Sequence, residues 1–332
     1  MKLMRSLLAV SLVAPIASFA CGGGEAPKAP ETTTSAPAPS STTAPSASAS
    51  ASASATTASV PAPTPIVKIT GLSTPESVHY DADGDRYFIS NIVGAPTAKD
   101  DNGYITIASP DGKIVTEKWV AGGKDGVTLN APKGLAVAKG DLWVADIDTV
   151  HAFDLKTGKH KASITIPGAT FLNDIAVAPD GKVYVTDSGL EGNDALVPSM
   201  TDAVYVIEKG VVTPLAKTRD LKNPNGIAVL ASGAIVVNTF GAAEVYRLGS
   251  KGEKLDITLL PGDKLDGLFA VGDTLYVSSW GAKAIYKGKL NGSFEPIYEG
   301  VQAPADLGLD TKRKRILVPR FVENCVDVFD LK

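Results

Sequence analysis

Short apolar runs rich in β-branched residues follow one another along most of the chain, separated by turns that contain Gly, Ser or Lys. One group of four such runs covers residues 227–229, 234–237, 245–248 and 257–260. Runs of this length and composition predict β-strands. Residues 66–332 contain no sustained 3.6-residue apolar period, so we expect neither helices between the strands nor a parallel α/β sheet.

A sixfold recurrence organises these strands, and its clearest copy is Pro224-Asn225-Gly226 followed by an apolar run. The second residues of the six copies, here called the channel residues, are Glu76, Lys133, Asn173, Asn225, Asp266 and Ala305. Successive channel residues are 57, 40, 52, 41 and 39 positions apart. A repeat near 40 residues with insertions is typical of β-propellers. We therefore predict an all-β, six-bladed β-propeller with four strands in each blade, in which the channel residues surround one mouth of the central channel.

A second recurrence lies 13 to 15 residues after the channel residues, where the second strand of each unit ends on a polar side chain. These strand-end residues are Asn91, Asp146, Asp187, Thr239, Ser279 and Arg320. In an antiparallel pair the second strand returns to the end where the first began, so we expect both sets on one rim. Arg320 is the cation of this set, and we predict that it contacts an anionic or carbonyl-bearing substrate. Pairing with Asp306 is the structural alternative.

The sixth unit has too few residues after Arg320 for two ordinary strands and a long turn. Residues 66–70 form a strand-like run that precedes the first unit and belongs to no blade. Such a strand can complete the sixth blade and close the ring without leaving an open edge. The propeller is therefore assigned to residues 66–332.

The chain begins with a segment typical of export. Residues 1–20 have a basic start, an apolar run and small residues before Cys21, the pattern of a cleaved signal peptide. Ser18-Phe19-Ala20-Cys21 resembles a bacterial lipoprotein cleavage box, in which the cysteine is lipidated. Residues 21–65 are almost entirely Ala, Ser, Thr, Pro and Gly, which predicts a disordered linker.

These features predict a protein of the bacterial cell envelope, lipid-anchored through Cys21 in the periplasm or outer membrane, with a secreted protein as the alternative. The formal net charge of −4 argues against nucleic acid as a partner. The two cysteines, Cys21 and Cys325, form no disulfide framework, and Cys325 is expected in the core. We expect a monomer that meets the membrane only through its anchor and binds a small-molecule substrate.

The channel residues suggest a metal site. Glu76, Asn173, Asn225 and Asp266 offer carboxylate and amide oxygens, which suit a hard divalent cation. Calcium is the first choice, with magnesium or another divalent cation as the alternative. The competing interpretation is that Asn and Asp start these strands because they form Asx-turns. Lys133 would share the ring, where it either binds an anionic substrate or carries its ammonium out to water.

Six blades with Glu in the first, Asn in the third, Pro-Asn-Gly in the fourth and Asp-Gly in the fifth resemble the senescence-marker/gluconolactonase-like family, which includes regucalcin. Paraoxonase, diisopropyl fluorophosphatase and strictosidine-synthase-like propellers are more distant. The resemblance implies a catalytic calcium on Glu76, Asn173, Asn225 and Asp266, with Asp266 as candidate base or nucleophile.

The resulting functional prediction is a calcium-dependent hydrolase of lactones or related esters. Asp266 takes the proton of the attacking water, and Asp187 is the second candidate for this role. The sequence from residue 66 onward contains no Gly-x-Ser-x-Gly motif and only three histidines, which argues against a Ser-His-Asp triad. A non-enzymatic envelope propeller that binds a small ligand or a protein partner is the alternative, because a fold alone does not define a function.

Overall fold

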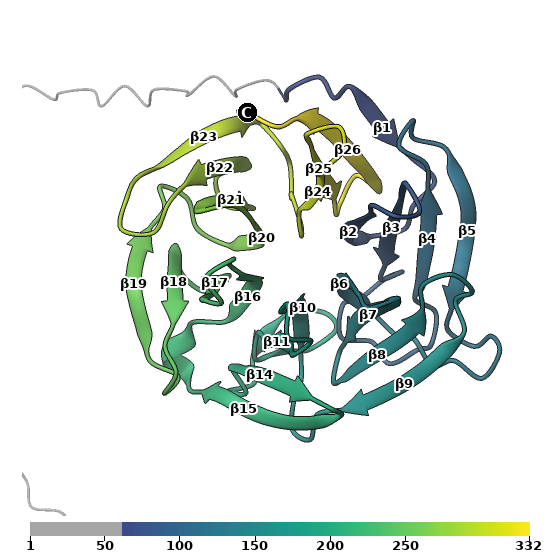
Figure 1. The fold of residues 1–332 in the computed structure, drawn as a ribbon, viewed down its shortest axis with the longest axis horizontal. Helices are drawn as coiled ribbons and strands as arrows, with labels where there is room; N and C mark the ends of the chain where they lie inside the picture. The colour runs from purple at the N-terminus through teal and green to yellow at the C-terminus, as the bar shows by residue number, and fades with distance from the viewer. Residues whose placement is uncertain (1–61) are drawn as a thin grey trace, which may run out of the picture. The chain divides into compact units, whose positions relative to one another are not determined.

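The computed structural model describes residues 62–332, which form six four-stranded antiparallel sheets arranged as blades around a central axis (Figure 1). Blade 1 contains β2 (Pro75–Asp81), β3 (Arg86–Asn91), β4 (Tyr104–Ala108) and β5 (Ile114–Ala121). Blade 2 contains β6 (Pro132–Ala138), β7 (Asp141–Asp146), β8 (Thr149–Asp154) and β9 (His160–Thr165). Blade 3 contains β10 (Leu172–Val177), β11 (Val183–Asp187), β14 (Ala203–Glu208) and β15 (Val211–Lys217).

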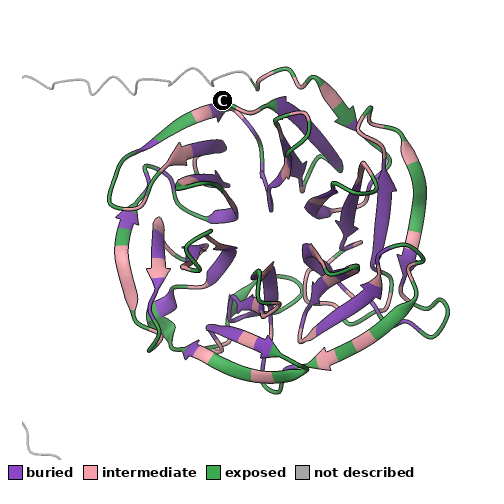
Figure 2. Cartoon of the chain, viewed as in Figure 1, coloured by how far each residue is buried: buried purple, intermediate pink, exposed green. Residues whose placement is uncertain are grey.

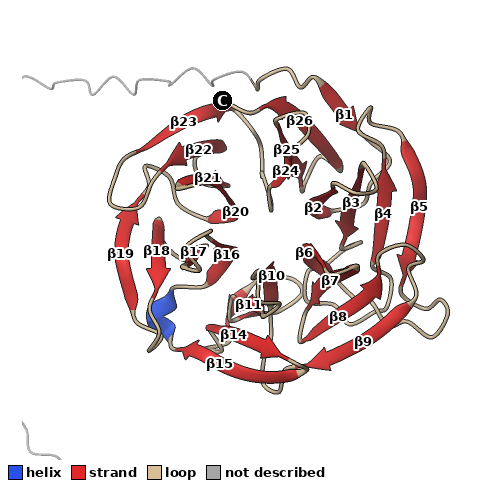
Figure 3. Cartoon of the chain, in the orientation of Figure 1, coloured by secondary structure: helices blue, strands red, loops and turns tan. Residues whose placement is uncertain are grey.

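Blade 4 contains β16 (Pro224–Val229), β17 (Ile235–Thr239), β18 (Glu244–Leu248) and β19 (Lys254–Leu259). Blade 5 contains β20 (Leu265–Val271), β21 (Thr274–Ser279), β22 (Ala284–Gly288) and β23 (Phe294–Glu299). Blade 3 also carries a small hairpin of β12 (Leu190–Glu191) and β13 (Val197–Pro198). One 3-10 turn, η1 (Arg219–Leu221), is the helical element of the described residues (Figure 3). The predicted all-β, six-bladed propeller is confirmed.

Blade 6 closes the ring with strands from both ends of the described chain, β1 (Val67–Ile69) outside β26 (Cys325–Asp330), β25 (Arg315–Arg320) and β24 (Gly308–Asp310). The strand β1 pairs antiparallel with β26, and in Figure 1 the first and last strands lie side by side. The fully buried Ile69 packs in one apolar cluster with Val326 and Val328 of β26. The predicted closure by residues 66–70 is therefore confirmed.

Apolar contacts between neighbouring sheets hold the blades together. Between blades 1 and 2, for example, the fully buried Phe88, Ile105, Leu142 and Phe153 share one cluster. The strands nearest the axis are buried along most of their length, whereas the outermost strands alternate with exposed positions (Figure 2). This alternation is what a strand with one face toward solvent requires.

The predicted signal segment 1–20, the lipidation site Cys21 and nearly all of the predicted linker 21–65 lie outside the described residues. Among the residues that the structure describes, no helix has the length and apolarity needed to span a membrane.

The closing strand gives a first test. We expect Ile69→Ala to lower the free energy of unfolding by about 2–5 kcal/mol, because it leaves a cavity in a closed apolar cluster. Ile66→Ala is the matched control, since Ile66 is 48% exposed and a surface substitution usually changes stability by less than about 0.5 kcal/mol. Urea denaturation followed by circular dichroism measures both. Equal losses for the two variants would contradict the closing role of β1.

Candidate metal and substrate site

Five of the six channel residues line one cavity of about 290 Å³ at one end of the channel: Glu76, Lys133, Asn173, Asn225 and Asp266. Each comes from the start of the innermost strand of a different blade. All five side chains are at least 95% buried. The sixth channel residue, Ala305, has no polar side chain to contribute.

A repeated backbone irregularity turns these side chains toward the axis. In blade 1, Pro75 pairs with Asn91 and Val78 with Ile89, so three steps along β2 match two steps along β3. The same shift occurs at the start of the innermost strand in blades 2 to 5. An extra residue in one strand bends it and redirects a side chain. The motif thus places one unpaired channel residue per blade beside the axis.

The glycines of Pro-Asn-Gly and Asp-Gly mark close approach between neighbouring innermost strands. A Cβ atom on Gly226 would lie 2.4 Å from the backbone oxygen of Asp266 in the next blade. A Cβ atom on Gly267 would lie 2.3 Å from the backbone nitrogen of Leu307. Only a residue without a side chain fits at either position, and the tight contact keeps the preceding channel residues close to one another.

Four buried oxygens at this site accept no hydrogen bond from the protein: Glu76 Oε2, Asn173 Oδ1, Asn225 Oδ1 and Asp266 Oδ1. Buried polar atoms are normally hydrogen-bonded, so four such oxygens around one cavity call for a partner that the protein does not supply. The Asx-turn interpretation requires these oxygens to accept backbone N–H groups, and they do not. Their number and type fit a hard divalent cation, with water or substrate completing six to eight ligands.

Hydrogen bonds on the other side of the Asn173 amide fix the direction of its free oxygen. Asn173 Nδ2 donates to Ser188 Oγ at 3.0 Å, and Ser188 Oγ donates to the backbone oxygen of Pro224 at 2.7 Å. With its nitrogen held in this way, Oδ1 is left facing the cavity. A ligand oriented by a neighbouring hydrogen bond is a usual feature of metal sites.

The carboxylates repel one another in the channel. Burial raises the pKa of Glu76 well above its usual value, and the Asp266 carboxyl raises it further, while Lys133 opposes the rise. Burial also raises the pKa of Asp266, with a further contribution from Asp306. Asp306, whose Oδ2 accepts a 2.5 Å hydrogen bond from Ser77 Oγ, has its own pKa raised by burial to about 7. A bound cation would relieve this repulsion.

Lys133 does not carry its ammonium out to water, because its side chain is 99% buried. Nζ donates to the backbone oxygen of Ala131 at 3.0 Å and lies 4.4 Å from the centre of the Phe171 ring. Burial lowers the pKa of Lys133 to about 8, against the attraction of Asp146 and Glu76. The cation–π contact and the neighbouring carboxylates hold a positive charge at the edge of the cavity.

Asp187, the second candidate for the base, binds backbone N–H groups of the neighbouring loops and does not face the cavity. Its Oδ1 accepts from the backbone N–H groups of Phe171 at 3.0 Å and Gly189 at 2.9 Å, and its Oδ2 accepts from Thr170 at 3.2 Å. It does not line the cavity. Asp146 binds the equivalent loop, so strand-end carboxylates secure the segment that leads into a channel residue. We therefore assign Asp187 to loop anchoring instead of proton transfer.

Arg320 is also directed away from the cavity. Its guanidinium contacts Asp327 Oδ2 at 2.7 Å, Glu323 Oε1 at 2.6 Å and the backbone oxygen of Gln302 at 2.8 Å. The expected structural partner Asp306 pairs with Ser77 instead. The structure thus does not bring Arg320 together with the other candidate residues, and its bond to Gln302 anchors a loop as the bonds of Asp187 do.

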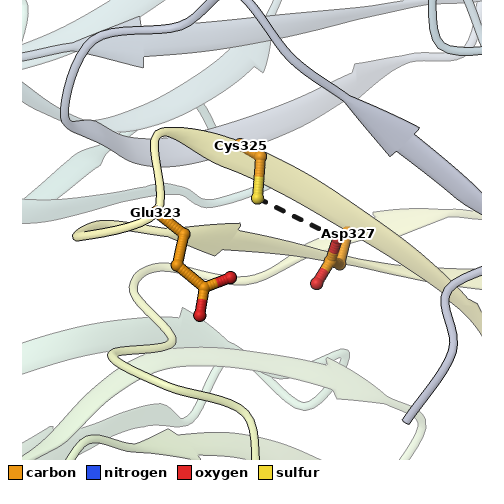
Figure 4. A group of neighbouring side chains, drawn as sticks. All are labelled: Glu323, Cys325 and Asp327. Carbon is orange, nitrogen blue, oxygen red and sulfur yellow. Dashed lines mark hydrogen bonds between the residues drawn. The ribbon is translucent and has the colours of Figure 1, made fainter. Parts of the chain in front are cut away.

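A second group of ligand-type atoms lies at the ring closure, where Glu323, Cys325 and Asp327 come within 4.8 Å of one another (Figure 4). Arg320 pairs with both carboxylates, and Lys68 Nζ lies 2.6 Å from Asp327 Oδ1. These two cations balance the carboxylates, so we interpret the group as an ion-pair network. Cys325 is 97% buried, in agreement with its expected place in the core.

The sequence analysis missed an apolar set that lines the same cavity: Ile92, Phe171, Leu190, Phe240, Trp280 and Phe321. Four of them, Ile92, Phe240, Trp280 and Phe321, directly follow a strand-end residue. An alignment of the six copies at the residue after each strand-end residue would have revealed these four apolar positions.

The long repeat intervals of blades 1 and 3 correspond to insertions beside the cavity. The hairpin β12–β13 contributes Asn193 and Leu196 to the lining, and the loop after β3 contributes Pro96. Thr97 Oγ1 of that loop donates to the backbone oxygen of Gly192 at 3.0 Å and to Asn193 Oδ1 at 2.6 Å. The two insertions thus support each other at the mouth.

No family model and no curated protein matches the sequence. Among solved structures, a gluconolactonase from Xanthomonas campestris is 16% identical, with a TM-score of 0.61 over 79% of this chain and 88% of that chain. The two chains share the propeller fold. A putative gluconolactonase (18% identity, TM-score 0.57, 80% and 94% covered) shares this propeller. Virginiamycin B lyase from Staphylococcus aureus also shares it, with 16% identity and a TM-score of 0.56 over 80% of this chain and 98% of that chain. At these identities the likeness establishes the propeller fold alone.

The raised carboxyl pKa values predict how calcium affinity depends on pH. Below the raised pKa values of Glu76 and Asp266 a cation must displace protons, so affinity should fall as pH falls. The raised pKa values lower the stability of the calcium-free fold: this loss is absent below the unfolded pKa values, near 4, grows as pH rises from there to the folded values, and is complete above them. Calcium should therefore stabilise the fold more at about pH 8 than at about pH 5.5.

Differential scanning calorimetry with and without calcium measures this effect. At a hundredfold excess over Kd the gain should be about 2.7 kcal/mol, or roughly 5–10 °C in Tm. Asn225→Ala is the control, because it removes one of the four free oxygens and should reduce the gain at both pH values. A calcium response that is larger at the acid pH would contradict the assignment.

Proposed function

We propose that this chain is a calcium-dependent hydrolase of lactones or related esters, with its active site in the cavity that Glu76, Asn173, Asn225 and Asp266 line. The observation that supports this most strongly is the set of four buried oxygens without hydrogen-bond partners. A bound divalent cation at such a site supplies Lewis-acid polarisation of a carbonyl group. Magnesium or another divalent cation has the same ligand preference for oxygen and is the alternative.

The chain's own residues provide the remaining chemistry. The Asp266 carboxylate accepts a proton from the attacking water, whose oxygen forms a bond to the carbonyl carbon as the bond to the ring or ester oxygen breaks. That proton passes from Asp266 to the departing oxygen, so the base is restored. A positioned carboxylate is a usual group for both of these proton transfers. The Lys133 ammonium, fixed beside the cavity, stabilises negative charge on the substrate.

Two insertions lie beside the cavity. The hairpin β12–β13 and the loop after β3 are joined through Thr97 and line part of it. Lys133 and the polar channel residues are themselves buried, so their charges and dipoles act on the substrate with less screening than in water.

A substrate screen with the full chain tests the proposal. Lactone and ester hydrolysis is followed by pH change in calcium, in chelator, and after calcium is restored. We expect turnover that chelator abolishes and calcium restores, with solvent ¹⁸O entering the carboxylate product. An unsaturated product without ¹⁸O would indicate elimination instead. A chain that binds no calcium by calorimetry and turns over no substrate would favour the alternative of a non-enzymatic propeller that binds a ligand or protein.

Two carboxylate variants distinguish the proposed general base, Asp266, from the loop-anchoring residue, Asp187. Asp266→Asn keeps an oxygen but cannot accept a proton near neutral pH, so hydrolysis should fall by at least about 10²-fold while measurable calcium binding persists. Asp187→Asn should lower Tm, because it weakens the anchoring of three backbone N–H groups, yet keep kcat at saturating calcium. Near wild-type turnover in Asp266→Asn would show that another group acts as the base.

A further inference from the structure

We infer that the site takes carbonyl compounds with an alkyl or aromatic substituent and rejects polyhydroxylated lactones. The substituent is held by a crescent of three aromatic side chains, Phe240, Trp280 and Phe321. This inference rests on the proposed function for the carbonyl end of the substrate, and on the cavity wall for the other end.

The crescent is continuous across blades 4, 5 and 6. The ring centres of Phe240 and Trp280 lie 6.0 Å apart in an edge-on arrangement, and those of Trp280 and Phe321 lie 5.3 Å apart. All three line the cavity, and each is only partly buried by the protein itself. Aromatic surface left open toward a cavity is available to bury an apolar group of a ligand.

The backbone holds the crescent in place. The N–H groups of Phe240, Trp280 and Phe321 donate at 2.9, 3.0 and 3.1 Å to backbone oxygens in the loop before the channel residue of the same blade. Their acceptors are Asn223, Lys264 and Ala303. Since each channel residue follows its acceptor by two positions, the crescent and the polar floor are fixed to the same loops. A wall ordered in this way binds without a large entropy cost.

The facing side of the cavity is apolar as well. Phe171, Leu190 and Ile92 line it, and Leu196 of the hairpin reaches it from the mouth. Away from the floor and Lys133, the polar lining residues are Asn193 and Asp194. A lactone with several hydroxyl groups would lose water from them here and find few partners, which disfavours binding. An alkyl or aryl group loses no hydrogen bond on the same transfer.

Trp280 joins the two parts of the site. It lines the same cavity as Asp266, and its buried Nε1 has no hydrogen-bond partner in the protein. The free N–H is a donor for an oxygen of the ligand, next to the carboxylate that we assign as base. It thus orients the carbonyl end while the ring supports the substituent.

The cavity has a volume of about 290 Å³ and is lined by both the polar floor and the crescent. A ligand with a small ring at the floor can therefore place a short chain against the crescent.

A homologous series tests the inference on the full chain. γ-Lactones with linear chains of increasing length are compared with glucono-δ-lactone in calcium. Burial of one methylene is worth about 0.8 kcal/mol, so kcat/KM should rise about fourfold per methylene until the cavity is full. Faster turnover of glucono-δ-lactone than of every alkyl lactone, or no dependence on chain length, would overturn the inference and leave the hydrolase proposal intact.

A binding measurement removes the dependence on turnover. Cyclopentanones with the same alkyl chains cannot be hydrolysed, and calorimetry with the calcium-loaded chain gives their affinities. We expect the same fourfold steps, with quenching of Trp280 fluorescence. Ketones that bind in this way, together with lactones and esters that are never hydrolysed, would support the crescent and contradict the proposed hydrolase. Ketones that bind without dependence on chain length would overturn the crescent.

Variants of neighbouring residues locate the effect. Phe321→Ala should reduce the step to less than about twofold per methylene for both lactones and ketones, and Phe321→Leu should restore most of it. Val322→Ala is the control, since Val322 is the next residue, is 60% exposed and does not line the cavity. Loss of chain-length dependence in Val322→Ala, or its retention in Phe321→Ala, would contradict the assignment. If Phe321→Ala does not fold, the wild-type series of lactones and ketones still decides.

Discussion

Close approach of the innermost strands is the constraint on which the rest of this propeller depends. Six sheets can share one axis only if their inner edges come together, and at Gly226 and Gly267 no side chain fits between neighbouring blades. The inner strands of blades 1 to 5 also carry an extra residue, whose side chain turns toward the axis. Polar atoms are thereby held in a place where the surrounding strands cannot satisfy them. The free oxygens of the channel are thus a consequence of ring geometry as well as of residue choice.

The electrostatics of the channel follow from this crowding. Burial raises the pKa of both Glu76 and Asp266, Asp266 adds to the rise at Glu76, and Asp306 adds to the rise at both. One ammonium, that of Lys133, opposes the rise at Glu76. The cavity thus combines a polar floor, where a cation would relieve this repulsion, with the aromatic wall formed by Phe240, Trp280 and Phe321.

The repeat made most of the fold predictable, because a period near 40 residues with a missing last strand leaves few arrangements other than six blades closed by β1. The metal-type oxygens of Glu76, Asn173, Asn225 and Asp266 were found in the same way, from their register in the repeat. The predicted site roles of Asp187 and Arg320 were wrong. The position of a residue in the repeat indicates at which end of a blade its side chain lies, but not whether the side chain points to the axis or binds a neighbouring loop. The hairpin β12–β13 and its contact with Thr97 depend on insertions, which have no counterpart in other copies and hence no register to read.

Because β1 pairs with β26, the ring cannot close until the strands of all six blades have been made. The first strand of the propeller leaves the ribosome before blade 1, and its partner follows only after blade 5. At about 5–20 residues per second the two ends are separated by on the order of half a minute. During that interval the edges of the first and last blades have nothing to pair with, and exposed edges promote aggregation. The pairing of β1 with β26 therefore removes both of these edges at once.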